Sequence, residues 1–291
     1  MNSFHGNKIN PTRIHRSQIK YFLFLITLSA FMLLPIVFMF SQAMKPIDEL
    51  FLYPPRFFVE NPTFKNFYDL FNVTSVTVIP MTRFLFNSIV VTSIVVFLSI
   101  TISAMAGFAL SKLEFKSKKI IFEANIIALM FVPAAMAIPR YFIVDALGLT
   151  DNLLGHIIPI LAMPVGLFLI KQFVDQIPNE LIQSASIDGA SNFTLFRKII
   201  LPIIMPALAT VAILAFQMAW NNTETSEIYM NNETLRTFAF YMTTLTGNLE
   251  NRVAGQGIAA AAALIMFVPN LIIFIFMQSR VIDTMAHSGL K

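Results

Sequence analysis

Six long runs of apolar residues divide this sequence, and they restrict its fold more than any other feature. An α-helix needs about 17–25 predominantly apolar residues to cross a bilayer. Backbone N–H and C=O groups find no partners in lipid, so a spanning segment of this length is helical. We therefore predict an all-α integral membrane protein with six transmembrane helices. The runs lie at 21–40, 84–110, 120–139, 153–170, 201–220 and 253–277.

The composition agrees with this interpretation and excludes several other classes. Hydrophobic residues make up 56% of the chain and charged residues only 12%, whereas soluble domains carry about 25% charged residues. The net charge of +4 does not indicate a nucleic-acid partner, because the basic residues gather beside the apolar runs and form no single basic face. The absence of cysteine excludes disulfides, Cys–zinc sites and thiol catalysis.

The first apolar run has two interpretations. Ser41-Gln42-Ala43 resembles a small-residue cleavage site, as at the end of a signal peptide. However, the apolar core of a signal peptide has about 7–15 residues, and this run is longer. We favour an uncleaved first transmembrane helix over 21–43. The proline-rich segment 44–82 is then an external loop with a short interfacial helix, and 221–252 is a second polar external loop.

The distribution of positive charge predicts the orientation. The N-terminus, the 112–119 loop, the stretch 171–200 and the tail hold 13 of the 20 Lys and Arg residues. Loops rich in Lys and Arg lie in the cytoplasm, so both termini and this stretch are predicted to be cytoplasmic. The predicted parts are a cytoplasmic N-terminus (1–20), the first helix (21–43), the extracytoplasmic loop (44–82), a core of five transmembrane helices (83–280) and a cytoplasmic tail (281–291).

The stretch 177–206 is half-polar, although it connects two apolar runs. Pro178 suits the first turn of a helix, and Glu180 is favoured near that positive end. Asp188-Gly189 ends the helix, because glycine readily adopts the left-handed C-cap conformation. Ser191 or Asn192 can cap a second short helix. The stretch therefore predicts a helix, a glycine turn and a second helix, after which Leu201-Pro202 leads into the fifth apolar run.

Apolar residues of the second short helix form a stripe. Phe193, Phe196 and Ile200 stand at positions i, i+3 and i+7, which share one helix face. One interpretation is an ordinary loop on the membrane surface. The other is a partner-binding element whose exposed apolar side chains enter a groove of another protein. The residues alone leave both open.

The segment resembles the EAA loop of binding-protein-dependent ABC importer permeases, specifically the MalG-like carbohydrate class. The residues that carry the resemblance are Pro178, Glu180-Leu181, Ala185, Ile187-Asp188-Gly189-Ala190-Ser191, Phe196, Ile199, Leu201-Pro202 and Pro206. Gln183-Ser184 departs from the family's usual Glu-Ala. The resemblance extends almost end to end through 62–67, Phe86-Asn87-Ser88, Gly107–Leu113, Leu147-Gly148-Leu149, Trp220-Asn221 and the terminal Ser288-Gly289-Leu290-Lys291.

This resemblance implies the type I ABC importer permease fold, with a cytoplasmic coupling helix between the fourth and fifth transmembrane helices. It implies a subunit that imports a sugar, a di- or oligosaccharide, through the cell membrane of a bacterium. The implied partners are a second homologous permease in a heterodimer, two copies of a sugar-type ABC ATPase, an extracytoplasmic sugar-binding protein and the lipid bilayer, with no nucleic acid. ATP and Mg would be bound by the ATPase subunits, so no cofactor is expected in this chain.

The resemblance also assigns residues to the contact with the ATPase. The coupling contacts it implies are Glu180, Leu181, Ala185, Asp188, Gly189, Ala190, Phe193 and Phe196. The tail contacts it implies are Ser288, Gly289 and Lys291.

Polar and aromatic residues at the external ends of the apolar runs are candidates for the substrate path. Sugars are bound through hydrogen bonds and aromatic stacking, and polar groups in spans usually face a cavity. The alternative is an interfacial aromatic belt with ordinary loop asparagines. The candidates are Gln217, Trp220, Asn221, Asn222, Tyr141 and Asn87.

The sequence contains no catalytic constellation. It lacks the G-x-x-x-x-G-K-[ST] phosphate loop, so ATP hydrolysis by that route is not expected of this chain. The four histidines (His5, His15, His156 and His287) are isolated, and no metal site is predicted. The alternative functions are an ABC permease for another solute and a stand-alone secondary transporter, which would need intramembrane acids and internal repeats.

Overall fold

A computed structural model of the chain describes residues 18–72, 79–249 and 253–288. Within these ranges the chain is helical and contains no β-strand. It forms two compact units. The first unit takes in Met1–Asn72 and Leu249–Leu264, and the second takes in Val73–Asn248 and Ile265–Lys291. The predicted division of the chain into an extracytoplasmic loop (44–82) and a core of five transmembrane helices (83–280) stays a prediction.

The predicted apolar runs fall on three helices and three bent helix pairs. Within the described ranges, three helices are long and apolar enough to cross a membrane, and up to six spans result if each bent pair is one span. The three helices are α1 (Ile19–Met44), α4 (Met81–Lys112) and the Gln256–Gln278 part of α15 (Gln256–Ser288). The pairs are α5 (Lys118–Met130) with η2 (Pro133–Met136) and α6 (Ala137–Ala146), α7 (Leu154–Leu161) with α8 (Pro164–Asp175), and Asn192–Ile203 with α12 (Met205–Trp220).

Prolines account for the bends within these pairs. The bend angles are 110°, 44° and 79° in chain order. Pro133, Pro164 and Pro206 each stand in the first turn of the second partner, where the missing N–H is not needed. The third predicted span, over 120–139, is thus not straight: it breaks after Met130 and continues into η2 and α6. Helix α5, with 13 residues, is about 20 Å long, which is less than the bilayer's apolar thickness of about 30 Å.

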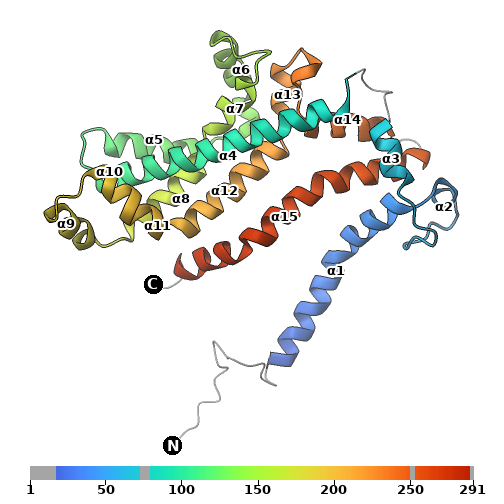
Figure 1. Cartoon of the computed structure of the whole chain (residues 1–291), viewed down its shortest axis with the longest axis horizontal. Helices are drawn as coiled ribbons and strands as arrows, with labels where there is room; N and C mark the ends of the chain where they lie inside the picture. The colour runs from blue at the N-terminus through green and yellow to red at the C-terminus, as the bar shows by residue number, and fades with distance from the viewer. Residues whose placement is uncertain (1–17, 73–78, 250–252, 289–291) are drawn as a thin grey trace, which may run out of the picture. The chain divides into compact units, whose positions relative to one another are not determined.

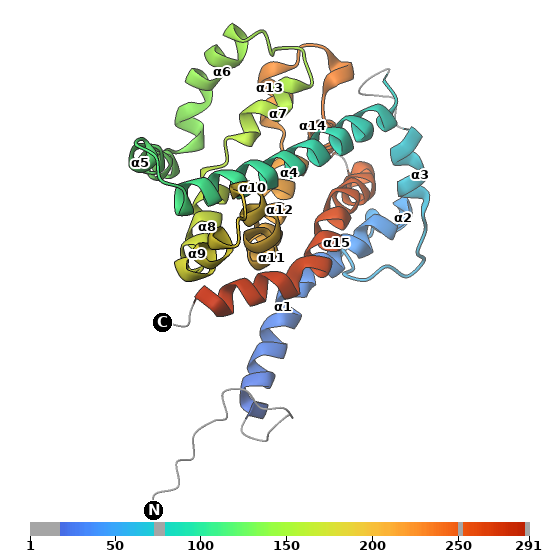
Figure 2. The same ribbon diagram turned by 60° about the vertical axis from the view of Figure 1, so that its left-hand side comes forward.

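The core of the second unit is built on α4, which packs along α8 and α12 (Figures 1 and 2). Small residues permit this close approach. A Cβ added at Gly107 would lie only 2.6 Å from Cγ2 of Ile170, so α4 and α8 meet at a glycine. On α12, Ala207, Val211 and Ala215 are fully buried in the same cluster.

The two ends of α4 carry different structures. Near its C-terminal end lie α9 (Asn179–Ile187) and α10 (Asn192–Leu195), and near its N-terminal end lie α13 (Glu224–Tyr229) and α14 (Phe238–Leu249) (Figure 1). Helices α13 and α14 correct the prediction of a polar loop over 221–252. Phe238, Tyr241 and Leu245 of α14 are buried, and their spacing of three and four residues is a helical signal within an otherwise polar segment.

In the first unit, the segment after α1 folds back onto the end of that helix. It contains α2 (Ile47–Leu50) and α3 (Lys65–Asn72). The side-chain amide of Asn66 donates to the carbonyl oxygens of Ala43 and Lys45, at 2.9 and 2.7 Å. Gly257 of α15 packs against the same amide, because an added Cβ would lie 2.7 Å from it. This supports the role in close packing that small residues serve in membrane helices.

Candidate functional site

The segment 177–206 forms a helical hairpin on the second unit. Helix α9 follows Pro178 and ends at Asp188. Gly189 has φ +83°, a left-handed conformation that glycine adopts readily and most other residues disfavour. The N–H of Ala190 donates to the carbonyl of Ala185 at 3.0 Å and closes the helix end. The turn predicted at Asp188-Gly189 is therefore present, and Gly189 is required for its backbone angle, since nothing lies within 4 Å of an added Cβ.

The second arm of the hairpin begins with the predicted cap. The Ser191 hydroxyl accepts a hydrogen bond from the N–H of Thr194 at 3.3 Å, at the start of α10. The chain then passes through the π-helical turn η3 (Phe196–Ile200) and the short α11 (Leu201–Ile203) before α12. The hairpin is thus joined through α11 to the core helix α12, at a bend of 79°.

The apolar side chains of the hairpin divide into a buried and an exposed set. The predicted stripe of Phe193, Phe196 and Ile200 does not face outward as a whole. Ile200 is fully buried, and Phe196 packs on Phe108 with ring centroids 5.6 Å apart. Only Phe193 is open, at 67% exposure. The reason is that η3 turns the chain into the core before the stripe is complete.

A different set of apolar side chains is presented by the hairpin. Ile187 is 85% exposed beside the glycine turn, and Leu181 and Phe193 are also exposed. Ala185 and Ala190, two of the predicted contacts, pack partly against the core, whereas Glu180 and Asp188 are exposed. Ile187 was not among the predicted contact residues. Its position next to the turn glycine was the signal that could have identified it.

The base of the hairpin is held by the C-terminal end of α4. The Lys112 ammonium donates to the carbonyl oxygen of Ile177 at 2.6 Å and to Oδ1 of Asn179 at 2.9 Å. Alongside, the Ser111 hydroxyl donates to Asp175 at 2.6 Å, and Lys171 donates to the other oxygen of that carboxylate at 2.6 Å. These polar contacts, here called the Lys112 clamp, join α4, α8 and α9. The sequence identified Lys112 as an orientation charge and as part of the Gly107–Leu113 resemblance, without a contact to the hairpin.

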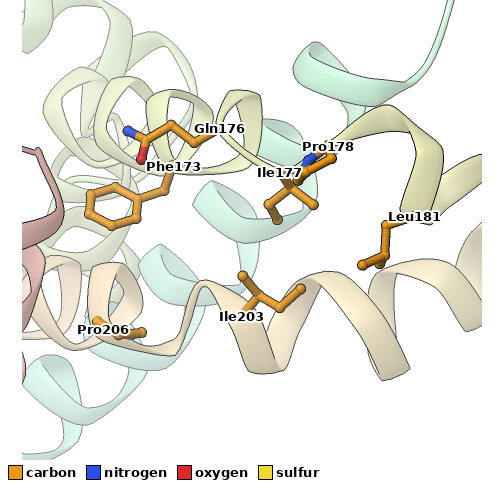
Figure 3. Close-up of a pocket in the computed structure, with 7 residues that line it drawn as sticks. All are labelled: Phe173, Gln176, Ile177, Pro178, Leu181, Ile203 and Pro206. Carbon is orange, nitrogen blue, oxygen red and sulfur yellow. The ribbon is translucent and has the colours of Figure 1, made fainter. Parts of the chain in front are cut away.

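A pocket of about 290 Å³ lies under α9 (Figure 3). It is bounded by the end of α8, the start of α9, and α11 and α12. Six of its lining side chains are apolar, and the seventh is an amide: Phe173, Ile177, Pro178, Leu181, Ile203, Pro206 and Gln176. Leu181 is the one α9 residue that lines this pocket, whereas Ile182 and Ala185 of the same helix pack partly against the core.

Trp220 and Asn87, two of the predicted substrate-path residues, are buried. Trp220 stacks on Phe216 with centroids 5.7 Å apart, and its indole N–H donates to the carbonyl of Met266 at 3.2 Å. Asn87 donates to the carbonyl oxygens of Thr234 and Arg236, at 2.8 and 2.9 Å. These partners give both side chains packing and hydrogen-bonding roles within the unit.

The remaining candidates are distributed over two places. Gln217 and Asn221 are exposed at the end of α12, where Asn221 forms an amide pair with Asn270 of α15. The side-chain oxygen Oδ1 of Asn222 accepts a hydrogen bond from the N–H of Thr225 at 2.9 Å. Elsewhere, Tyr141 of α6 stacks on Tyr229 of α13 at 6.4 Å. Gln217 and Asn221 are thus the two candidates that are exposed, and the substrate path through the six residues stays a prediction. Asn270 was missed, although an asparagine within an apolar run is itself a signal.

His156 is fully buried between the Thr225 hydroxyl (2.7 Å) and the Leu235 carbonyl (3.0 Å), as expected of an isolated core histidine. Ser288 is the last described residue, and Gly289 and Lys291 lie outside the described residues.

The fold and the hairpin together define a class: a helical membrane protein whose core helices carry an exposed, jointed hairpin at one end. The family model of the binding-protein-dependent transport system inner membrane component matches residues 20–279. The chain belongs to this family, which consists of the membrane permease components of ABC transporters.

Named relatives and a solved structure agree with this assignment. The trehalose transport system permease protein SugB of Mycobacterium tuberculosis is 28% identical over 89% of this chain and 92% of its own length. The arabinooligosaccharides transport system permease protein AraQ of Bacillus subtilis is 28% identical over 92% and 94%. A chain of a bacterial ABC transporter involved in the import of the acidic polysaccharide alginate matches with a TM-score of 0.77 at 20% identity, over 92% of this chain and 99% of that one. That structure shares the fold.

Proposed function

We propose that this chain is the permease subunit of an ABC importer that takes up a sugar, a di- or oligosaccharide. The relatives support the class of solute, because their names specify trehalose, arabinooligosaccharides and, for a relative from Streptomyces coelicolor, diacetylchitobiose. In this proposal the chain forms half of a translocation path with a second, homologous permease. An extracytoplasmic binding protein delivers the sugar. The complex lies in the cell membrane of a bacterium.

The observation that carries the coupling part of the proposal is the exposed apolar set on the hairpin. The side chains of Leu181, Ile187 and Phe193 are exposed. They lie on an otherwise polar hairpin at one end of the membrane-embedded core. Short helices that present such side chains bind in grooves of partner proteins. We assign the groove to an ATPase subunit, two copies of which would bind ATP and Mg. Hydrolysis would then displace α9, and the Lys112 clamp and α12 would pass that displacement to the core.

The positive-inside distribution supports the orientation that this proposal needs. Lys112, Lys116, Lys118 and Lys119 stand in or directly beside the short connection between α4 and α5, and Lys112 contacts the base of the hairpin. Short connections rich in lysine lie in the cytoplasm. In this proposal the hairpin and both termini are cytoplasmic. The end of α12 with Gln217 and Asn221 then lies toward the opposite side of the membrane, where amides contact the sugar hydroxyls.

The test of the whole proposal is purification of the tagged chain from native membranes, followed by identification of the subunits that accompany it. We expect a second permease and an ATPase, and we expect a sugar-loaded binding protein to stimulate ATP hydrolysis by the reconstituted complex. A chain that is purified without an ATPase, and that transports a solute on an ion gradient alone, would contradict the proposal.

A matched pair of variants tests the docking surface. Ile187→Asp places a charge where the proposed groove is apolar, and it should strongly reduce the amount of ATPase that accompanies the chain. Ser186→Asp adds the same charge one residue earlier, at another exposed position, and keeps the apolar side chain. It should retain the ATPase. Equal retention by both variants would place the contact elsewhere.

A further inference from the structure

Helix α3 in the first unit presents an aromatic face to its surroundings. Phe64, directly before the helix, and Tyr68 and Phe71 within it are 72%, 71% and 57% exposed. They stand at i, i+4 and i+7, which places them on one side of a helix. The opposite side carries Asn66 and Leu70, both buried. The helix is therefore divided into an inner face that is packed and an outer face that is aromatic.

The position of α3 along α1 is fixed by hydrogen bonds. The N–H of Thr63 donates to the carbonyl oxygen of Met44 at 2.8 Å. Asn66 donates to the carbonyl oxygens of Ala43 and Lys45. These acceptors belong to the last turn of α1 and the residue that follows it. The start of α3 is thus tied to the end of the apolar helix.

The exposed length of α1 shows where that end lies in a bilayer. Large apolar side chains are exposed on α1 from Ile19 to Phe40, and Ser41 is the first buried residue after them. This exposed stretch is about 33 Å long at a rise of about 1.5 Å per residue, close to the apolar thickness of about 30 Å. The last turn of α1 therefore reaches the boundary between hydrocarbon and headgroups.

From these observations we infer that α3 lies in the headgroup layer of the membrane, with Phe64, Tyr68 and Phe71 inserted among the lipids. Aromatic side chains are enriched at this depth, since they combine an apolar body with a polar edge or hydroxyl. Amphipathic helices at an interface bury their apolar face about 5–10 Å into it. Lys65 is exposed three residues before Tyr68, so its ammonium can reach lipid phosphates. The inference rests on membrane insertion of α1 and is independent of the transported solute.

The absence of cysteine makes a direct depth measurement feasible. Single replacements Tyr68→Cys and Phe71→Cys would be spin-labelled in the assembled complex, reconstituted in vesicles of phosphatidylethanolamine and phosphatidylglycerol. Two further labelled variants calibrate the depth: Phe31→Cys, an exposed position within α1, and Glu60→Cys, an exposed position in the segment before α3. All four side chains are exposed, so the replacements remove no core packing. Collision of the label with O2, which concentrates in lipid, is compared with collision with a water-soluble nickel chelate.

The expected result is an O2-to-nickel ratio for positions 68 and 71 that lies between the values for positions 31 and 60. A ratio equal to that of position 60 would place α3 in water and overturn the inference. Protection of both labels from both reagents would show that a protein partner covers the aromatic face, and this would also overturn it.

Discussion

The ammonium of Lys112 lies 2.6 Å from the carbonyl oxygen of Ile177, so a side chain of α4 holds the residue from which the hairpin starts. The same ammonium reaches Asn179, the first residue of α9. Leu181 of α9 lines a pocket, whereas Ile182 packs partly against the core. Lys112 therefore connects the start of the hairpin to α4, and the chain itself connects the end of the hairpin to α12.

Replacing Lys112 with methionine should uncouple transport from ATP hydrolysis. A hydrogen bond from a charged group contributes about 1.5–3 kcal/mol. Its loss would change the equilibrium constant between two positions of the hairpin by roughly tenfold or more. We expect the sugar transported per ATP hydrolysed to fall by a similar factor. Lys116→Met is the matched control, because Lys116 is exposed in the same basic loop. Equal ratios in the two variants would show that the Lys112 clamp transmits nothing.

The close approach of Gly107 to Ile170 leads to a prediction about the stability of the core. Gly107→Ala forces a Cβ to within 2.6 Å of Cγ2 of Ile170, and such overpacking costs about 1–3 kcal/mol. Ile170→Ala removes Cγ2 together with the rest of the side chain beyond Cβ, so the double variant Gly107→Ala/Ile170→Ala should be more stable than the sum of the two single effects predicts.

Gly247→Ala is the control for this measurement. Gly247 lies in α14 with nothing within 4 Å of an added Cβ, so alanine should be neutral or stabilise the helix by up to about 1 kcal/mol. The melting temperature of each detergent-solubilised variant is measured: Gly107→Ala, Ile170→Ala, the double variant and Gly247→Ala. Additive effects of the two core replacements would contradict the contact.

Trp220 and Asn221 are neighbours with different expected effects. Trp220→Ala removes a buried indole from between Phe216 and Phe238, and such truncations cost about 3–5 kcal/mol. Its main effect should be loss of thermal stability, and Trp220→Phe should recover most of it.

Asn221→Ala should leave stability within about 0.5 kcal/mol, as is usual for exposed positions, and should lower sugar uptake. Met218→Ala, exposed on the same helix, is the control for uptake. Unchanged uptake by Asn221→Ala would remove the amide from the proposed path.

Asp151 should make stability depend on pH in the acid range. The backbone N–H of Asn232 donates to its carboxylate at 2.8 Å and, with the Asn231 amide, holds the pKa of this carboxyl below its ordinary value. A lowered pKa stabilises the folded state above the unfolded-state pKa of about 3.9, and this contribution is lost as the pH falls below that value. The melting temperature should therefore decline more steeply between about pH 5 and pH 3 than in Asp151→Asn, whose side chain does not titrate. Identical slopes would refute the assignment.

The local chemistry of the hairpin could be predicted from sequence because it depends on few residues. Pro178 before the first helix, the glycine turn and the Ser191 cap each follow from a backbone requirement of a single residue. The apolar runs could be placed because their length alone indicates membrane-spanning segments.

The exposed face of the hairpin and the clamp that holds it could not be predicted. The π-helical turn at Phe196–Ile200 rotates the apolar stripe into the core, and helical periodicity alone does not indicate such a turn. Lys112 and Ile177 meet across 65 residues of sequence, and only the packing of α4 on α8 brings them together. The burial of Trp220 likewise depends on α14, whose pattern was hidden among polar residues.

In the proposed mechanism, the hairpin turn at Gly189 passes the displacement driven by ATP hydrolysis to the transport path. The most direct test measures sugar uptake and ATP hydrolysis by proteoliposomes that contain Gly189→Val or Gly189→Asn. Valine is strongly disfavoured at φ +83°, whereas asparagine tolerates this region. Neither side chain would meet a neighbour within 4 Å at Cβ, so the core should remain folded in both. We predict that Gly189→Val assembles but loses uptake, and that Gly189→Asn retains most of it. Full uptake per ATP hydrolysed by Gly189→Val would contradict the account.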